Sequence, residues 1–209
     1  MLFRSIIHRE HLAAKHFRYE DVIKTVLEIV NFIRVNGKNH RQFRNFEEEL
    51  EIEDAPSDVS LYCVVGWLST SNLLSRFVDL LKPINLFLDE KKNSYPHLKN
   101  NERIQDLMFL TDIMKHLQTL NLVLQGTEKI ILDLAQTVFS FQNKIKVFQR
   151  DIMSKTFNLF PNLKMTLNAI TDVITDHKVE EYEDKLQGLL EEFQVRFDDL
   201  QELKPYVPC

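Results

Sequence analysis

Residues that form tight turns are scarce in this sequence. The 209-residue chain contains only four Gly and six Pro. Sandwiches and barrels of many strands need frequent turns, so this scarcity argues against them and favours long helices. Fifteen Phe are present, and they would fill the seams between such helices.

Cysteine is also rare. The two that occur, Cys63 and Cys209, cannot build the disulfide framework of a small secreted domain, which is typical of a protein from a reducing compartment. We therefore expect the nucleus or the cytoplasm. No run of 18 apolar residues occurs, and the apolar start of the chain is shorter than the core of a signal peptide, so we expect neither a membrane span nor a secretion signal.

The familiar catalytic motifs are missing. The sequence contains no Gly-rich phosphate loop, no nucleophile elbow, no Cys-x-x-Cys and no His-Glu-x-x-His. Four of the seven histidines fall early, at His8, His11, His16 and His40. His8 and His11 could share a helix face, but no acid or thiol at ligand spacing completes a zinc site. We expect no metal site and no cofactor.

Charge is distributed unevenly. Residues 1–45 carry nine Lys or Arg against four Asp or Glu, a net charge of +5, whereas the whole chain carries −5 and the remainder therefore −10. Six cations of this segment are candidates for contact with an anionic partner such as DNA: Arg4, Arg9, Lys15, Lys38, Arg41 and Arg44. The alternative is that they coat solvated helix faces.

Hydrophobic periodicity predicts an all-α fold. Apolar residues recur at helical spacing over 11–35, with Gly37 as a stop, and over the shorter segment 39–51. A further helix should begin at Ser69 or Ser71, and Pro83 should bend or split it.

The second half of the chain shows longer helical patterns. Helices over 104–124 and 131–152 should form a hairpin around Gly126, and a last helix should cover 186–200. Two short strands are predicted, over 2–7 and 59–65. We expect a single, mostly helical domain over 1–209.

Five segments resemble, in the same order, hAT-type transposase-derived proteins, in particular the general transcription factor II-I repeat, BED zinc-finger and SCAN domain-containing relatives. The segments are "IIHREHLAAK" (6–15), "VNFIRVNGKNHRQFRNFEEEL" (30–50), "GWLSTSNLLSRFVDL" (66–80), "LNLVLQG" (120–126) and "FQVRFDDL" (193–200). The resemblance covers nearly the whole chain.

The resemblance implies that the chain is the helical insertion of an RNase H-like transposase core. Residues 1–15 and 58–67 would be remnants of the incomplete core or junctions to it, with one or two short strands, and 68–209 the insertion. His8 matches the histidine of the family's Cys-x-x-His motif, whose Cys position is Ser5 here. The family's two-metal chemistry needs two Asp before this motif and one Glu after the insertion. None of these acids can be assigned, so we expect no DNA cleavage or strand transfer.

Trp67 matches the tryptophan of the family's Arg-Trp-Leu-Ser motif, which is thought to support a flipped base near the active site. Here Gly66 replaces the arginine, which removes the neighbouring phosphate partner. Trp67 is therefore either a nucleic-acid contact or an aromatic anchor between insertion and core.

These observations lead to one main hypothesis for function. The chain would be a non-catalytic, domesticated transposase-derived fragment that acts as a protein-interaction or assembly module. The faces of 104–152 or 179–203 would contact another protein or a second copy of the chain. The alternatives are weak, non-specific DNA binding through the basic segment, a piece of a larger active transposase, and a decayed gene product without a selected role.

Overall fold

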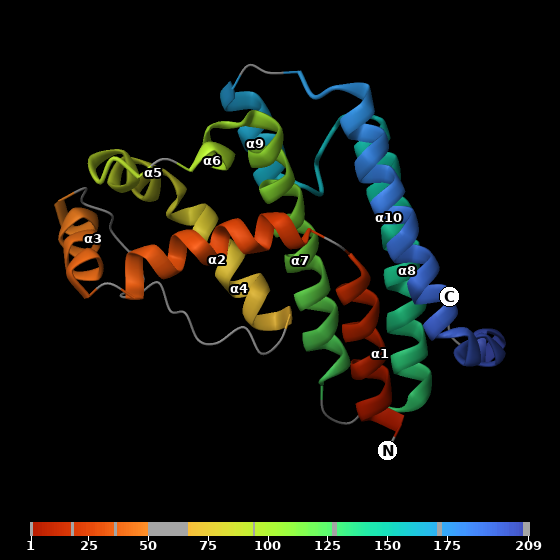
Figure 1. The fold of residues 1–209 in the computed structure, drawn as a ribbon. Coiled ribbons are helices and arrows are strands. Elements are labelled where there is room, and N and C mark those ends of the chain that lie inside the picture. The colour runs from red at the N-terminus through yellow and green to blue at the C-terminus, as the bar shows by residue number, and fades with distance from the viewer. Residues whose placement is uncertain are drawn as a thin grey trace. The chain divides into compact units, whose positions relative to one another are not determined.

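The computed structural model describes residues 2–17, 19–35, 37–49, 67–93, 95–126, 129–170 and 173–206. Helix is the only regular secondary structure in these ranges (Figure 1). The predicted all-α class is thus confirmed for the described part of the chain.

The chain divides into two compact units. The central unit comprises Tyr19–Thr111, and the terminal unit combines Met1–Arg18 with Asp112–Cys209. Helix α7 (Asn101–Leu124) contributes its first half to the central unit and its second half to the terminal unit. Each unit is described by itself below.

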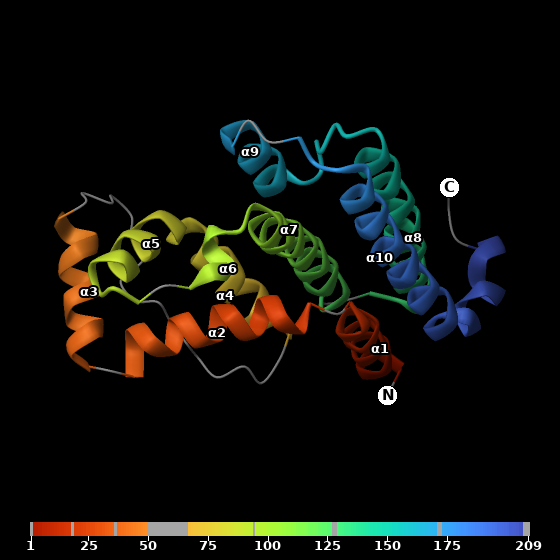
Figure 2. The same cartoon turned by 45° about the horizontal axis from the view of Figure 1, so that its top comes forward.

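Five further helices build the central unit: α2 (Glu20–Val35), α3 (Gly37–Glu49), α4 (Trp67–Asp79), α5 (Leu81–Glu90) and α6 (Pro96–Lys99). Helix α3 packs against α2 and α5, and Figure 2 shows these three neighbours clearly. The rings of Phe43 on α3 and Phe87 on α5 meet edge to face at 5.2 Å. The apolar positions predicted for the first long helix are all buried: Val22, Val26, Ile29 and Ile33.

Pro83 splits the helix in which it was predicted to lie. Helix α4 ends at Asp79 and α5 begins at Leu81, so Pro83 falls in the first turn of α5, where no intrahelical partner for its nitrogen is needed. The predicted start at Ser69 or Ser71 is wrong, because α4 already begins at Trp67 and Ser71 is buried within it.

The terminal unit contains α1 (Leu2–His16), the second half of α7, α8 (Ile131–Met153), α9 (Pro161–Ile170), α10 (Asp176–Arg196) and the 3₁₀ helix η1 (Asp198–Tyr206). Helices α8 and α10 run side by side along their length, and α1 packs against α10 (Figure 1 and Figure 2). The apolar face predicted for α10 and its continuation is buried at every position: Leu186, Leu190, Phe193, Phe197 and Leu200.

Aromatic rings fill the interface between these helices. We call the buried residues Phe141, Phe148, Phe160, Phe193 and Phe197 the aromatic seam. Phe141 and Phe193 join α8 to α10 with ring centroids 5.2 Å apart, and Phe148 meets Phe160, just before α9, at 5.6 Å. Such pairs contribute about 0.5–1.5 kcal/mol each beyond the apolar area that they bury.

Two predictions for the N-terminal segment are wrong. The strand expected over 2–7 is the start of α1, and the helix expected over 11–35 is divided between α1, which ends at His16, and α2, which begins at Glu20. Ile6, Ala13 and Phe17 are buried, at separations of seven and four residues that suit a helix and not a strand. The described residues of the segment 1–15 therefore hold no strand remnant of an RNase H-like core. The second predicted strand, 59–65, lies outside the described residues.

The predicted hairpin is only partly correct. Helix α7 ends just before Gly126 and α8 follows, as expected, and their apolar stripes are buried. However, the main partner of α8 is α10, while α7 reaches α8 through the ring of His116, stacked 4.5 Å from Phe148. Periodicity identifies the buried face of a helix but not the helix that covers it.

Candidate functional site

The six predicted DNA-contacting cations lie on two helices in different units. Lys38, Arg41 and Arg44 project from α3 in the central unit, and all three are exposed. Separations of three residues place them on one side of the helix, away from the buried Phe43. The Nε of Arg41 donates to the Gly37 carbonyl oxygen at 3.2 Å, a bond within the same helix. We call these three cations the basic face of α3.

Arg9, in the terminal unit, is bonded to other residues of that unit. Its guanidinium donates to the Asp199 carboxylate at 2.5 Å and to the Arg196 carbonyl oxygen at 3.1 Å, and it lies 5.9 Å from the centre of the Phe197 ring. A cation at the carbonyl end of α10 is favoured by the helix dipole. Arg9 therefore links α1 to the end of α10 and the start of η1 through these bonds.

The remaining predicted site residues are less informative. The side chains of Arg4, Lys15 and Trp67 lie outside the part of the chain that the structure describes. His8 is exposed, and its ring stacks on that of His11 at 6.5 Å, so the two share a helix face as predicted. Within the described ranges, no three His, Cys, Asp or Glu side chains come together as a metal site.

Glu10 is a fully buried acid that the sequence pattern did not single out. Its Oε2 accepts a hydrogen bond from Asn121 Nδ2 at 2.9 Å, whereas its Oε1 is buried with no partner among the described residues. Burial raises the pKa of Glu10 from 4.5 to about 8, and the bond from Asn121 only partly opposes this. Glu10 is therefore protonated at neutral pH and joins α1 to α7.

Asp112 caps a helix that lies far from it in sequence. Its Oδ1 accepts from the Asn162 side chain at 2.7 Å, and its Oδ2 accepts from the Leu163 backbone nitrogen at 3.1 Å, so it satisfies the first free amides of α9. Burial raises the pKa of Asp112 to about 6, although these hydrogen bonds lower it.

The segment between α8 and α9 is held by buried polar groups. Asp151 accepts from the backbone nitrogens of Asn158 at 3.0 Å and Leu159 at 2.8 Å. His116 Nε2 donates to the Leu159 carbonyl oxygen at 2.9 Å, and burial lowers the pKa of this imidazole. Lys155 and Phe157 adopt positive φ angles of 54° and 51°, which side chains disfavour, so these bonds compensate local strain.

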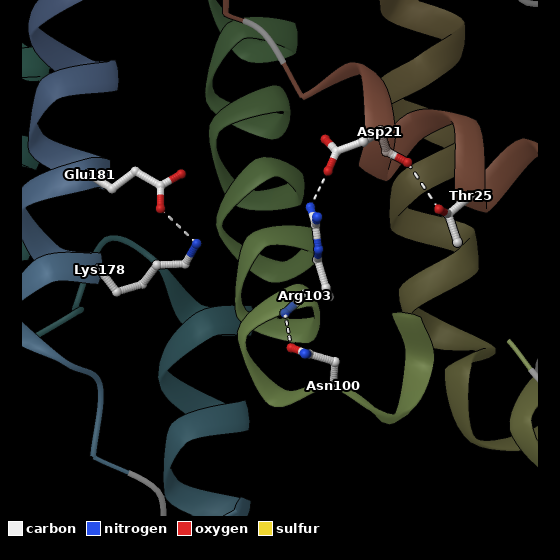
Figure 3. A network of polar contacts seen from close by, with 6 residues as sticks. All are labelled: Asp21, Thr25, Asn100, Arg103, Lys178 and Glu181. Carbon is white, nitrogen blue, oxygen red and sulfur yellow. Dashed lines mark hydrogen bonds and ion pairs between the residues drawn. The ribbon is translucent and has the colours of Figure 1, made fainter. Parts of the chain in front are cut away.

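The central unit contains a small polar network (Figure 3), whose residues Asp21 and Arg103 also line a pocket. Arg103 pairs with Asp21, and its backbone nitrogen donates to Asn100 Oδ1 at 3.0 Å at the start of α7. The adjoining pocket, which Leu98 and Ile104 also line, has a volume of about 20 Å³. That is room for about one water molecule and too little for a metabolite.

Figure 3 also draws a separate pair in the terminal unit, Lys178 with Glu181, 2.8 Å apart on α10. It links consecutive turns of one helix, and Lys178 is itself buried. None of the described helices combines the length and the apolar character needed to cross a membrane.

The sequence did contain a signal for the buried acids. Glu10 lies between the buried Ile6 and Ala13, and Asp112 interrupts the apolar run from Leu107 to Met114. An acid within an apolar stripe indicates a buried polar group that needs a partner. The identity of the partner depends on tertiary contacts, which the sequence alone does not reveal.

Comparison with known proteins identifies relatives over most of the chain. Residues 4–153 match the family model described as the FAM200/GTF2IRD2 helical domain. General transcription factor II-I repeat domain-containing protein 2 of Bos taurus is 30% identical over 194 residues, which make up 93% of this chain and 20% of that protein. Its namesake in Mus musculus is 30% identical over 196 residues, covering 94% of this chain and 20% of that protein. The chain thus spans about a fifth of the length of these relatives. No solved structure matches it.

The buried Glu10 predicts a pH-dependent stability. Because its pKa is raised from 4.5 to about 8 in the folded protein, its protonated form contributes stability that is complete below pH 4.5 and is lost as the pH rises through 8. Glu10→Gln keeps an acceptor for Asn121 but cannot ionise. Between about pH 5 and pH 8, urea unfolding should show the parent losing on the order of 3 kcal/mol relative to this variant.

The matched control is Glu202→Gln, which removes an exposed acid of the same unit. Its unfolding free energy should follow the parent's pH profile. If the Glu10→Gln protein and the parent kept parallel profiles up to pH 9, the assignment of Glu10 as a buried neutral acid would be wrong.

Proposed function

Because the chain belongs to the FAM200/GTF2IRD2-like helical domain family, we propose that it is a non-catalytic protein-interaction module of a domesticated hAT transposase-derived protein, acting in the nucleus or the cytoplasm. The resemblance of five ordered segments to hAT-type proteins supports this origin. The all-helical character of the described residues supports an assembly role, since amphipathic helix faces commonly serve as contact surfaces.

The observation that carries the proposal is a group of exposed apolar side chains where α7 connects to α8. Leu122 is 61% exposed, Val123 43% and Ile130 59%. We call these three residues the apolar tip. Exposed large apolar residues that lie together mark protein contacts, because a partner that covers them removes apolar surface from water.

Buried residues on either side hold Leu122 and Val123 of the apolar tip in place. Leu120 and Leu124 are buried on either side of Leu122 and Val123, and Asn121 is bonded to Glu10. These anchors fix the last turn of α7, so that the two apolar side chains between them face outward. The segment "LNLVLQG", part of the resemblance to hAT-type proteins, thus supplies both the anchors and the exposed surface.

A second candidate function is weak, non-specific DNA binding through the basic face of α3. The supporting observation is that Lys38, Arg41 and Arg44 are exposed on one side of a single helix. Such a surface would contact phosphates and would not distinguish sequences.

The assembly proposal predicts concentration-dependent association of the purified chain. Light scattering coupled to size exclusion should show a mass above 24.8 kDa that rises with concentration. Leu122→Gln combined with Val123→Gln should shift the equilibrium toward the monomer, because glutamine keeps the helix but removes the apolar contact.

Met165→Gln serves as the control, since Met165 is 63% exposed on α9 of the same unit and lies outside the apolar tip. It should leave the association unchanged. Equal masses for the parent and the double variant at every concentration would exclude the apolar tip as the contact.

The DNA alternative predicts an affinity on the order of 10⁻⁴–10⁻⁶ M for duplex DNA at physiological salt, independent of sequence. Changing Arg41 and Arg44 to Ala should flatten the dependence of log affinity on log salt by about one unit per lost phosphate contact. Fluorescence anisotropy at several salt concentrations measures this. Lys24→Ala with Lys82→Ala removes two exposed cations from α2 and α5 of the same unit and should change the slope less. Absence of binding at low salt would eliminate this candidate.

A further inference from the structure

A polar cleft opens in the terminal unit where α8, the end of α10 and η1 meet. It encloses about 300 Å³, a volume within the range of small-ligand sites. Amide side chains and two lysines, Lys146 and Lys204, form much of its lining, together with one acid, Asp198, and the ring of Phe139.

One of the lining amides is buried and unpaired. The Gln142 side chain is only 7% exposed, and its Nε2 has no hydrogen-bond partner among the described residues. A buried donor without an acceptor costs free energy, so its retention in a well-packed helix calls for an explanation. An acceptor supplied by a ligand in the cleft would provide one.

A second glutamine on α8 shows what kind of acceptor such a side chain takes between α8 and α10. Gln149, two turns further along the same side of α8, donates from its Nε2 to the Glu183 carboxylate at 2.8 Å and to Gln187 Oε1 at 3.0 Å. Gln194 on α10 lies one heptad beyond Gln187, and it lines the cleft without bonding to Gln142. Gln142 therefore lacks an acceptor such as the one that the Glu183 carboxylate offers to Gln149.

The charges around the cleft favour an acceptor with a single negative charge. Lys146 and Lys204 are exposed, and within the described part of the chain neither forms an ion pair. Two cations and an amide donor attract an oxyanion. Asp198 offsets one of the two lysines, so the lining carries one net positive charge, which a single carboxylate would balance.

We propose that this cleft binds the side-chain carboxylate of an acidic residue on a partner peptide, with Gln142 Nε2 and the ammonium groups of Lys146 and Lys204 as donors. The remaining amides would pair with the peptide backbone, and Phe139 would contact its aliphatic part. The inference rests on the proposed function as a protein-interaction module and names the chemistry of one partner contact.

The test is a titration of the full chain, labelled with ¹⁵N, followed by NMR, which detects side-chain amide groups directly. The ligand is the capped peptide Ala-Glu-Ala, and its matched control is capped Ala-Gln-Ala. The glutamate peptide should shift the side-chain amide signal of Gln142 in a saturable manner, and the glutamine peptide should bind about tenfold more weakly.

Three variants localise the effect. Lys146→Gln and Lys204→Gln, both at exposed positions, should each weaken the glutamate peptide several-fold, and Gln142→Leu should do so without unfolding the chain. Lys115→Gln removes an exposed cation of α7, which lines no part of the cleft, and should leave the affinity unchanged.

Two outcomes would overturn the inference. One is the absence of a saturable shift with the glutamate peptide. The other is saturable binding of inorganic phosphate in a parallel titration without binding of the peptide. Association through the apolar tip is measured separately by light scattering, so failure of this cleft and failure of the assembly proposal are distinguishable.

Discussion

The contact between Phe141 and Phe193 organises the terminal unit. These two rings join α8 to α10, and each extends into further ring contacts, Phe141 with Phe148 and Phe193 with Phe197. Phe148 in turn contacts the ring of Phe160 and the stacked ring of His116. Because rings pack in few geometries, this seam fixes the register of α8 against α10 and ties α7 and the start of α9 to the same core.

The polar features of this unit follow from the aromatic seam. Consecutive helical residues lie about 100° apart, so a residue that follows a buried one lies at the edge of the buried face. Gln142, Gln194 and Asp198 directly follow Phe141, Phe193 and Phe197, and all three line the cleft. The buried rings therefore determine which residues line the cleft. Asp112 and Asp151 accept hydrogen bonds from the backbone on either side of Phe160 and so hold its ring in the core.

The local pattern predicted several of the helices, whereas the contacts between distant segments could not be read from it. Spacing predicted the buried apolar stripes of α2, α8 and α10. Pro83 and Gly126 predicted the break before α5 and the turn after α7. The position of α1 was not predicted, because Arg9 bonds to Arg196 at the end of α10 and Glu10 bonds to Asn121 on α7, each more than a hundred residues away. The basic residues lie close together in the sequence, but Arg9 and the basic face of α3 belong to separate units.

The central claim is that the aromatic seam holds the terminal unit together, and urea unfolding of the Phe193→Ala variant tests it most directly. Phe193 is fully buried, so its truncation should lower the free energy of unfolding by about 3–5 kcal/mol. Val195→Ala, at a 76% exposed position of the same helix, should stay within about 0.5 kcal/mol of the parent. A Phe193→Ala protein as stable as the Val195→Ala protein would contradict the account.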